Sequence, residues 1–154
     1  MKLLLTRHRK AATRETLLIS AFQKDQTRTL EVSVSEAAIE SFAVLSGDNA
    51  PIHMDAAFAR KFGFSGRVVH GAYLMALVSR FVGLELPGPR AVLERMDFAF
   101  RNPCYAPANL KIIGKVTQVS EAVSSIILQI EVRNANAHDL LLASGKSWHR
   151  ILEE

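Results

Sequence analysis

The stretch Gly71–Gly83 reads GAYLMALVSRFVG, and only Ser79 and Arg80 within it are clearly polar. Its length suits three turns of helix, and a helix that is apolar almost all round is expected to be buried on nearly every side. The tripeptide at residues 87–89, Pro-Gly-Pro, stops whatever precedes it. We therefore predict a buried helix over residues 71–83.

After this helix the sequence changes to alternating apolar and polar residues, which is typical of strands. Turn-forming residues near positions 107, 120–121 and 134–136 divide the region into about four long strands. These strands are marked by Val92, Met96, Phe98 and Phe100 on one parity, by Leu110, Ile112 and Val116, by the run from Val123 to Val132, and by the run from Leu140 to Trp148.

Before the apolar helix, residues 27–34 alternate in the manner of a half-buried strand. Ser35 is a plausible N-cap for a following helix, although Ser33 with Glu36 also fits a capping box. Gly47 ends that helix well, because glycine tolerates the left-handed conformation. Residues 46–53 are expected to be loop, and a second helical turn is expected over residues 55–62.

The first of these helices is expected to present one apolar face to the core. The residues assigned to that face are Ala38, Ile39, Phe42 and Leu45.

The order of elements is therefore strand, helix, long loop, buried helix and about four antiparallel strands. A single sheet of five or six strands needs a cover on one face, and the apolar helix is the obvious cover. We predict an α+β hot-dog fold, in which an antiparallel β-sheet wraps around a buried central helix. Residues 1–20 are predicted to be an N-terminal extension or edge element, and residues 21–154 the hot-dog domain.

Composition excludes several classes of protein. The chain has 154 residues, 49% hydrophobic and 22% charged, which argues against disorder. No apolar run approaches the roughly 18–20 residues of a membrane span. The formal net charge of +4 is not gathered into a basic run, and no nucleic-acid-binding motif appears. We expect a protein that binds neither nucleic acid nor membrane.

The single cysteine, Cys104, excludes a disulfide within the chain and favours a reducing compartment, so we expect a cytoplasmic protein. Catalysis by its thiol stays open. A lone cysteine between a proline and a tyrosine is more often a small apolar filler.

Two histidines stand out among the titratable groups. Asp48 and His53 flank a loop bent by Gly47 and Pro51, and they converge if the loop folds back. A converging carboxylate and imidazole can hold one water, with one group taking a proton as the other gives one. The plainer interpretation is that Asp48 caps the next turn and His53 is an ordinary loop residue.

His70 and Gly71 immediately precede the apolar helix. The first N–H groups of a helix lack partners and carry positive partial charge, so they can stabilise an oxyanion. Alternatively, Gly71 only relieves crowding and His70 makes a structural hydrogen bond. Ser79 either bonds the carbonyl four residues earlier or reaches Asp48 and orients its carboxylate.

The combined string of motifs resembles the MaoC-like hydratase family, in particular the (R)-specific enoyl-CoA hydratases and related acyl-thioester dehydratases. The resemblance covers about residues 27–152 and is densest over residues 35–105. It is carried by FAVLSGD at 42–48, PIHMD at 51–55, FGF at 62–64, VHG at 69–71, LPG at 86–88 and FRNP at 100–103.

The resemblance implies a hot-dog homodimer that reversibly hydrates trans-2-enoyl thioesters to (R)-3-hydroxyacyl thioesters, carried on CoA or acyl carrier protein. Asp48 and His53 match the family's catalytic pair, and Gly71 matches the glycine whose N–H holds the thioester carbonyl. Ser79 matches a serine that bonds the catalytic aspartate, and His70 is grouped with the substrate-binding residues. No metal or other cofactor is implied.

Two positions depart from the family pattern. Ala50 stands where the family usually has asparagine, and Pro107-Ala108 stands where it often has Gly-Asp. The first departure lies close to the chemistry, so a non-catalytic thioester-binding or partner subunit stays open as an alternative. A thioesterase on the same fold is a further alternative.

Overall fold

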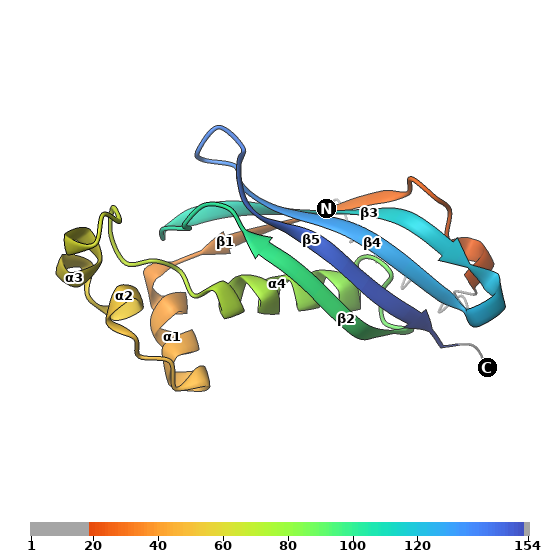
Figure 1. Ribbon diagram of the computed structural model, residues 1–154, viewed down its shortest axis with the longest axis horizontal. Coiled ribbons are helices and arrows are strands. Elements are labelled where there is room, and N and C mark those ends of the chain that lie inside the picture. Colours follow the sequence, from red (N-terminus) through yellow and green to blue (C-terminus); the bar gives the residue numbers. More distant parts are fainter. Residues whose placement is uncertain (1–18, 153–154) are drawn as a thin grey trace, which may run out of the picture.

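The computed structural model describes residues 19–152, and the predicted order of elements is confirmed over them (Figure 1). A short 3-10 helix, η1, at Ile19–Ala21 precedes the main body, and a second, η2, at Glu121–Val123 lies between the third and fourth strands. The helices are α1 (Glu36–Ser46), α2 (Pro51–Met54), α3 (Ala56–Lys61) and α4 (Gly71–Leu84). The strands are β1 (Thr27–Val34), β2 (Ala91–Phe100), β3 (Ala108–Ser120), β4 (Ser125–Asn134) and β5 (Leu140–Ile151).

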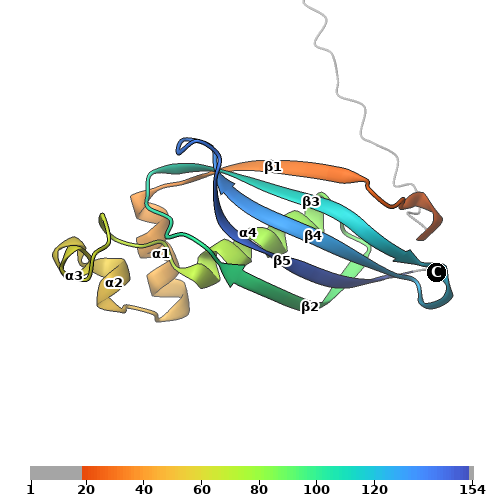
Figure 2. The same cartoon turned by 45° about the horizontal axis from the view of Figure 1, so that its top comes forward.

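The five strands form one antiparallel sheet in the order β1-β3-β4-β5-β2. This sheet curves around α4, which lies along its concave face (Figure 2). Helices α1, α2 and α3 gather beyond the end where α4 begins (Figure 1). The arrangement is the predicted hot-dog fold, and it leaves the start of α4 facing the three shorter helices.

The core forms between one stripe of α4 and the inner face of the sheet. The buried residues of α4 recur at helical spacing: Leu74, Leu77, Val78, Phe81 and Val82. Each fully buried apolar side chain contributes roughly 1.5–3 kcal/mol. The opposite face of α4, which carries Ala72, Ala76, Ser79 and Arg80, is exposed. Burial on nearly every side is therefore wrong within a single chain, because the sheet covers only one side of the helix.

The predicted face of α1 is also partly wrong. Ser35 is the N-cap, since its hydroxyl accepts from the N–H of Ala38 at 3.2 Å. Ile39 and Ala43 are buried, but Leu45 is 83% exposed. Six residues beyond Ile39, Leu45 lies about 120° round the helix and points away from the core.

A bulge in β2 breaks the predicted parity of that strand. The pairing of β2 with β5 shifts between Leu93 and Arg95, so one extra residue enters β2 there. Leu93 consequently packs against the core, and Val92 turns outward and is 38% exposed. Met96 and Phe98, beyond the bulge, face the core as predicted.

The predicted extension over residues 1–20 lies outside the described residues except for its last two positions. Ile19 and Phe22 are both buried in the core, so the packed body includes them. No helix within residues 19–152 has the length and hydropathy that a membrane span requires.

His149 on β5 is a buried polar residue that the sequence did not single out. It is 1% exposed and its Nε2 lies 2.8 Å from the hydroxyl of Ser147, which is also buried. Burial lowers the pKa of His149 from 6.5 to about 4. The imidazole is therefore neutral in the folded protein under conditions where the unfolded chain protonates it.

This difference predicts an acid-dependent loss of stability. Between the two pKa values the unfolded chain binds the extra proton, so the free energy of unfolding falls as the pH drops from 6.5 to about 4. The full loss is about 3 kcal/mol. Urea unfolding across this range should show a clearly flatter pH dependence for His149→Gln than for the wild type. Equal slopes for the two proteins would contradict the assignment.

Candidate active site

The turn after α1 places Asp48. Gly47 adopts φ 75° and its N–H closes α1 onto the carbonyl of Ala43 at 2.8 Å. Asp48 follows directly, and its Oδ1 accepts from the N–H of Ala50 at 3.2 Å. This bond closes a tight turn and leaves Oδ2 for another partner, but Asp48 does not cap the next helix, because the N-cap of α2 is Ala50 and no side chain caps it.

His53 lies on a short helix rather than in the predicted loop. Pro51 begins α2 instead of preventing a helix, because proline at the first helical position needs no N–H. The Nδ1–H of His53 donates to the carbonyl of Val68 at 2.7 Å, since a carbonyl can only accept. When the His53 ring is neutral, Nε2 is then its acceptor nitrogen, on the side of the ring away from the Val68 carbonyl.

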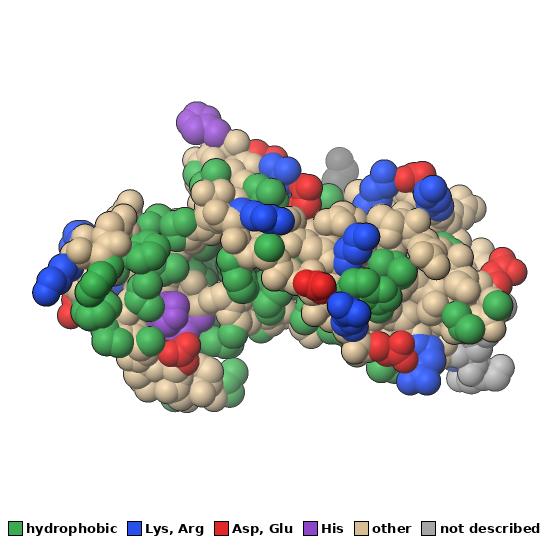
Figure 3. All heavy atoms as spheres, in the orientation of Figure 1, with side chains coloured by type: hydrophobic (Ala, Val, Ile, Leu, Met, Phe, Trp, Pro, Cys, Tyr) green, Lys and Arg blue, Asp and Glu red, His purple; other side chains and the backbone are tan. Residues whose placement is uncertain are grey.

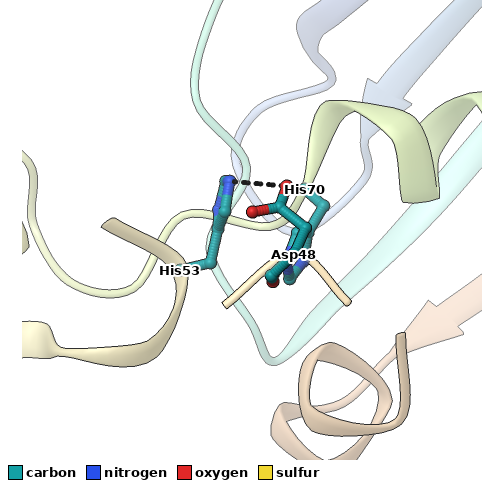
Figure 4. A group of neighbouring side chains, drawn as sticks. All are labelled: Asp48, His53 and His70. Carbon is teal, nitrogen blue, oxygen red and sulfur yellow. Dashed lines mark hydrogen bonds and ion pairs between the residues drawn. The ribbon is translucent and has the colours of Figure 1, made fainter. Parts of the chain in front are cut away.

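Asp48 and His53 converge across this turn, so the first interpretation of the pair is supported by their geometry (Figure 4). Nε2 of His53 lies 3.9 Å from Oδ2 of Asp48, with the two side chains 15% and 48% exposed. That separation is too long for a direct hydrogen bond and suits two groups that share one water. The pair can therefore hold a water between two proton acceptors.

His70 lies beneath this pair. It is 1% exposed, its Nε2–H donates to the main-chain carbonyl of Asp48 at 2.9 Å, and its ring stacks on His53 at 3.9 Å between centroids. Its Nδ1 is buried with no hydrogen-bond partner among the described residues. His70 is thus directed toward the other two residues and does not line the pocket described next.

Gly71 and His53 line one pocket of about 450 Å³. Its walls are mostly apolar, and Arg101 supplies a charge among them. The ring of Phe100 packs on Gly71 so closely that a Cβ there would lie 2.8 Å from Cζ of the ring. The pocket therefore brings an apolar cavity, the start of α4 and the imidazole of His53 together. The remaining lining residues are Ile52, Phe64, Val68, Val69, Leu74, Asn102, Pro103 and Cys104.

Cys104 is an inert part of this lining. It is 2% exposed, and burial raises the pKa of its thiol to about 11. The thiol therefore stays protonated near neutral pH, which favours the interpretation of a small apolar filler.

Two other expected contacts are not made within one chain. Ser79 is exposed, and no hydrogen bond joins it to Asp48 or to the carbonyl four residues earlier in the described residues. Arg67, a cation near the site, pairs with Glu36 and with Glu40, the latter at 3.3 Å.

The ligand atoms of Asp48, His53 and His70 lie within 4.8 Å of one another, close enough to raise the question of a metal. The two rings, however, are stacked with only 26° between their planes. Because an imidazole binds a metal in its ring plane, two rings stacked in this way cannot direct lone pairs at a single ion. The geometry suits acid–base chemistry better than a metal centre.

Apolar side chains surround the site on the surface. Figure 3 shows hydrophobic residues grouped around histidine and carboxylate side chains at the end of the molecule that carries α1, α2 and α3. Exposed apolar residues of these helices include Val44, Leu45 and Phe58, and Phe62 directly after α3 is exposed as well.

The fold and site together define a hot-dog protein with a carboxylate–imidazole pair whose histidine lines an apolar pocket. The model of the MaoC like domain matches residues 19–136, so the chain belongs to the MaoC-like domain family. The chain is 34% identical over 101 residues, 66% of its length, to a 3-hydroxybutyryl-CoA dehydratase of Methylorubrum extorquens, and this match spans 60% of that enzyme. It is 31% identical over 96 residues to an (R)-specific enoyl-CoA hydratase of Aeromonas caviae, covering 62% of this chain and 72% of the relative.

Solved structures agree with this assignment. An (R)-hydratase from A. caviae involved in PHA biosynthesis superposes with a TM-score of 0.79 at 25% identity, covering 86% of this chain and 98% of that one. The R-hydratase PhaJ1 from Pseudomonas aeruginosa superposes with a TM-score of 0.81 at 25% identity, covering 90% and 88%.

The departure at Ala50 has a local physical meaning. Ala50 is the N-cap of α2, with φ −55° and ψ 135°, and it offers no side chain to the first N–H groups of the helix that carries His53. Asparagine, the residue usual in the family, is among the best N-cap residues. Asn49 does not substitute, because no side chain caps α2 and the Asn49 NH2 group donates instead to the carbonyl of Gly47 at 3.2 Å.

We therefore expect Ala50→Asn to stabilise the protein by about 1 kcal/mol, by capping α2. Chemical denaturation measures the change. Ala57→Asn, which places the same side chain at an exposed position inside α3, should instead cost up to about 0.7 kcal/mol. If both variants shift stability in the same direction, the missing cap is not the reason.

Proposed function

We propose that this protein reversibly hydrates trans-2-enoyl thioesters to (R)-3-hydroxyacyl thioesters. The observation that carries the proposal is the pair of proton acceptors, Asp48 Oδ2 and His53 Nε2, facing each other at 3.9 Å beside an apolar pocket. The named activities of its relatives, on 3-hydroxybutyryl-CoA and enoyl-CoA, support the same class of reaction.

The substrate is placed by the start of α4. The thioester carbonyl would accept from the N–H of Gly71, and the acyl chain would enter the apolar part of the pocket. The first N–H groups of a helix have no intrahelical partner and carry partial positive charge. They would therefore stabilise the negative charge that develops on the carbonyl oxygen.

The proton transfers of water addition then need only Asp48 and His53. A water held between Asp48 and His53 donates to both, which directs its oxygen lone pair toward the β-carbon. One of the two groups takes a proton as the new carbon–oxygen bond forms and the double-bond electrons move to the thioester oxygen. That proton then passes to the α-carbon as the enolate collapses, so water is added without any redox change.

The direct test is a hydration assay with enoyl thioesters of several chain lengths, on both CoA and acyl carrier protein. We expect loss of the conjugated enoyl absorbance and formation of the (R)-3-hydroxy product on at least one carrier. Release of free thiol would indicate a thioesterase instead. Thermal stabilisation by the thioesters without turnover would indicate a binding subunit.

The proposal includes a homodimer, because no segment within residues 19–152 covers the exposed face of α4. It also includes a cytoplasmic location, which the single cysteine favours. The exposed face of α4 carries Ala72, Ala76 and Ser79, whose small side chains permit a second helix to approach closely. Ser79 lies about 12 Å from Gly71 along the axis of α4. Asp48 lies near the other end of this distance, because its carbonyl accepts from His70, the residue before Gly71. Ser79 would therefore reach Asp48 only from a second copy whose α4 runs in the opposite direction.

Mixed dimers test this arrangement. We expect Ser79→Ala to lower kcat about tenfold without changing the dimer mass, because it removes one hydrogen bond to a catalytic carboxylate. A dimer of one Ser79→Ala chain and one Asp48→Asn chain should retain one intact site, formed by Ser79 of one chain and Asp48 of the other. A monomeric mass in solution, or a mixed dimer with no more activity than the roughly tenfold slower Ser79→Ala sites supply, would contradict the proposal.

A further inference from the structure

The buried imidazole of His70 contacts both members of the candidate catalytic pair. It donates from Nε2 to the main-chain carbonyl of Asp48 at 2.9 Å, and its ring stacks on His53 at 3.9 Å (Figure 4). Asp48 lies 22 residues before His70 and His53 lies 17 residues before it, so this single side chain joins three separate segments. Asp48 is also held by the N–H of Ala50 and His53 by the carbonyl of Val68, but the His70 side chain contacts both residues.

The surroundings of His70 fix its own orientation. Phe42 of α1 packs against the ring, with centroids 5.1 Å apart and planes at 57°. The His70 residue is 1% exposed. The main chain just before it is also fixed, because the N–H of Val69 donates to the carbonyl of Cys104 at 2.8 Å. Because His70 is itself fixed by these contacts, it can hold Asp48 and His53 in place.

The hydrogen bonding of His70 also fixes its tautomer. The carbonyl of Asp48 can only accept, so Nε2 carries the proton and Nδ1 is the lone-pair nitrogen of a neutral ring. Nδ1 is buried without a partner among the described residues. Such a nitrogen serves no structural hydrogen bond among the described residues.

We infer that His70 is a positioning residue for the reaction: it sets the Asp48 turn through one hydrogen bond and the His53 ring through stacking. It acts through the other two residues and touches no substrate, because it does not line the pocket. This inference rests on the proposed function and assigns His70 a role distinct from the substrate contact suggested by the resemblance.

Two substitutions separate the two contacts. His70→Phe keeps an aromatic ring for stacking and removes the donor, whereas His70→Gln keeps an N–H donor of similar reach and removes the ring. We expect each to lower kcat about tenfold and His70→Ala to lower it about 100-fold, since small misplacements of reacting groups are costly. KM should stay within about twofold of the wild type.

His149→Gln is the matched control, because His149 is a histidine of the core that is as buried as His70. Its ring contacts Ser147 rather than Asp48 or His53. This variant should lose thermal stability and keep its kcat per folded molecule. The inference is overturned if His70→Phe or His70→Gln keeps the wild-type kcat, if the loss lies in KM alone, or if His149→Gln loses kcat equally.

A second readout does not depend on turnover. Stacking on an aromatic ring shifts the NMR signals of the His53 ring protons, and this shift should persist in His70→Phe and disappear in His70→Gln. If the wild type fails to hydrate enoyl thioesters but the shift behaves as expected, the proposed function fails and the positioning of His53 stands. If the shift is the same in all variants, the inference fails whatever the activity.

Discussion

Asp48→Asn should lower kcat for enoyl thioester hydration by about 1,000-fold, because an amide cannot take the proton that the carboxylate takes. The amide oxygen can still accept from the N–H of Ala50, so the turn that carries residue 48 should survive. Initial rates measure the loss, and circular dichroism melts check that the fold is unchanged. His53→Gln should show a loss of similar size, since glutamine offers no basic nitrogen.

Asp97→Asn serves as the matched control for this substitution. Asp97 is an exposed carboxylate on β2 that pairs with Arg95 at 3.4 Å and has no contact with the pocket. Its replacement should leave the rate unchanged. An Asp48→Asn enzyme that retains a tenth or more of the wild-type kcat would remove Asp48 from the mechanism.

Gly145→Ala should destabilise the fold more than any other single glycine substitution that we consider. Gly145 on β5 pairs with Phe98 on β2, and a Cβ at this position would lie 2.0 Å from the carbonyl oxygen of Asp97 and 2.7 Å from Cα of Phe98. These neighbours are main-chain atoms, so the two strands must separate to make room. We expect a loss of about 3 kcal/mol or more, at the upper end of the cost of overpacking.

Gly66→Ala is the control for the fold, because a Cβ at Gly66 meets nothing within 4 Å. Its effect on the free energy of unfolding, measured in urea, should be within about 0.5 kcal/mol of zero. If Gly145→Ala unfolds at the same urea concentration as Gly66→Ala, the close approach of β2 and β5 is wrong.

Most of the fold could be predicted from periodicity because the strongest signals are local. The apolar run at residues 71–83 and the alternating runs after it specify a helix and strands by their own spacing. The bulge in β2 could not be predicted, because it depends on how β2 pairs with β5, and one inserted residue reversed the side of Val92. Leu45 was misplaced because its apolar character was given more weight than its spacing, which puts it about 120° round the helix from Ile39.

The candidate site could be predicted only in part, for a similar reason. Asp48 and His53 are close in sequence, so a bent loop was enough to bring them together. The contacts of His70 with Asp48 and His53 depend on the packing of α1, α2 and the start of α4, which no local pattern encodes. The packing of Phe100 on Gly71 likewise joins residues from different elements, so the sequence indicated crowding at Gly71 but not the residue that causes it.

The most direct test of the central claim is the fate of oxygen when the protein acts on a trans-2-enoyl-CoA in water labelled with heavy oxygen. We predict that the wild type places the label on the β-carbon of an intact (R)-3-hydroxyacyl-CoA, and that Asp48→Asn forms almost none of this product. Label found instead in the carboxylate of a released acid, with free CoA thiol, would contradict the account, as would an unlabelled and unchanged thioester.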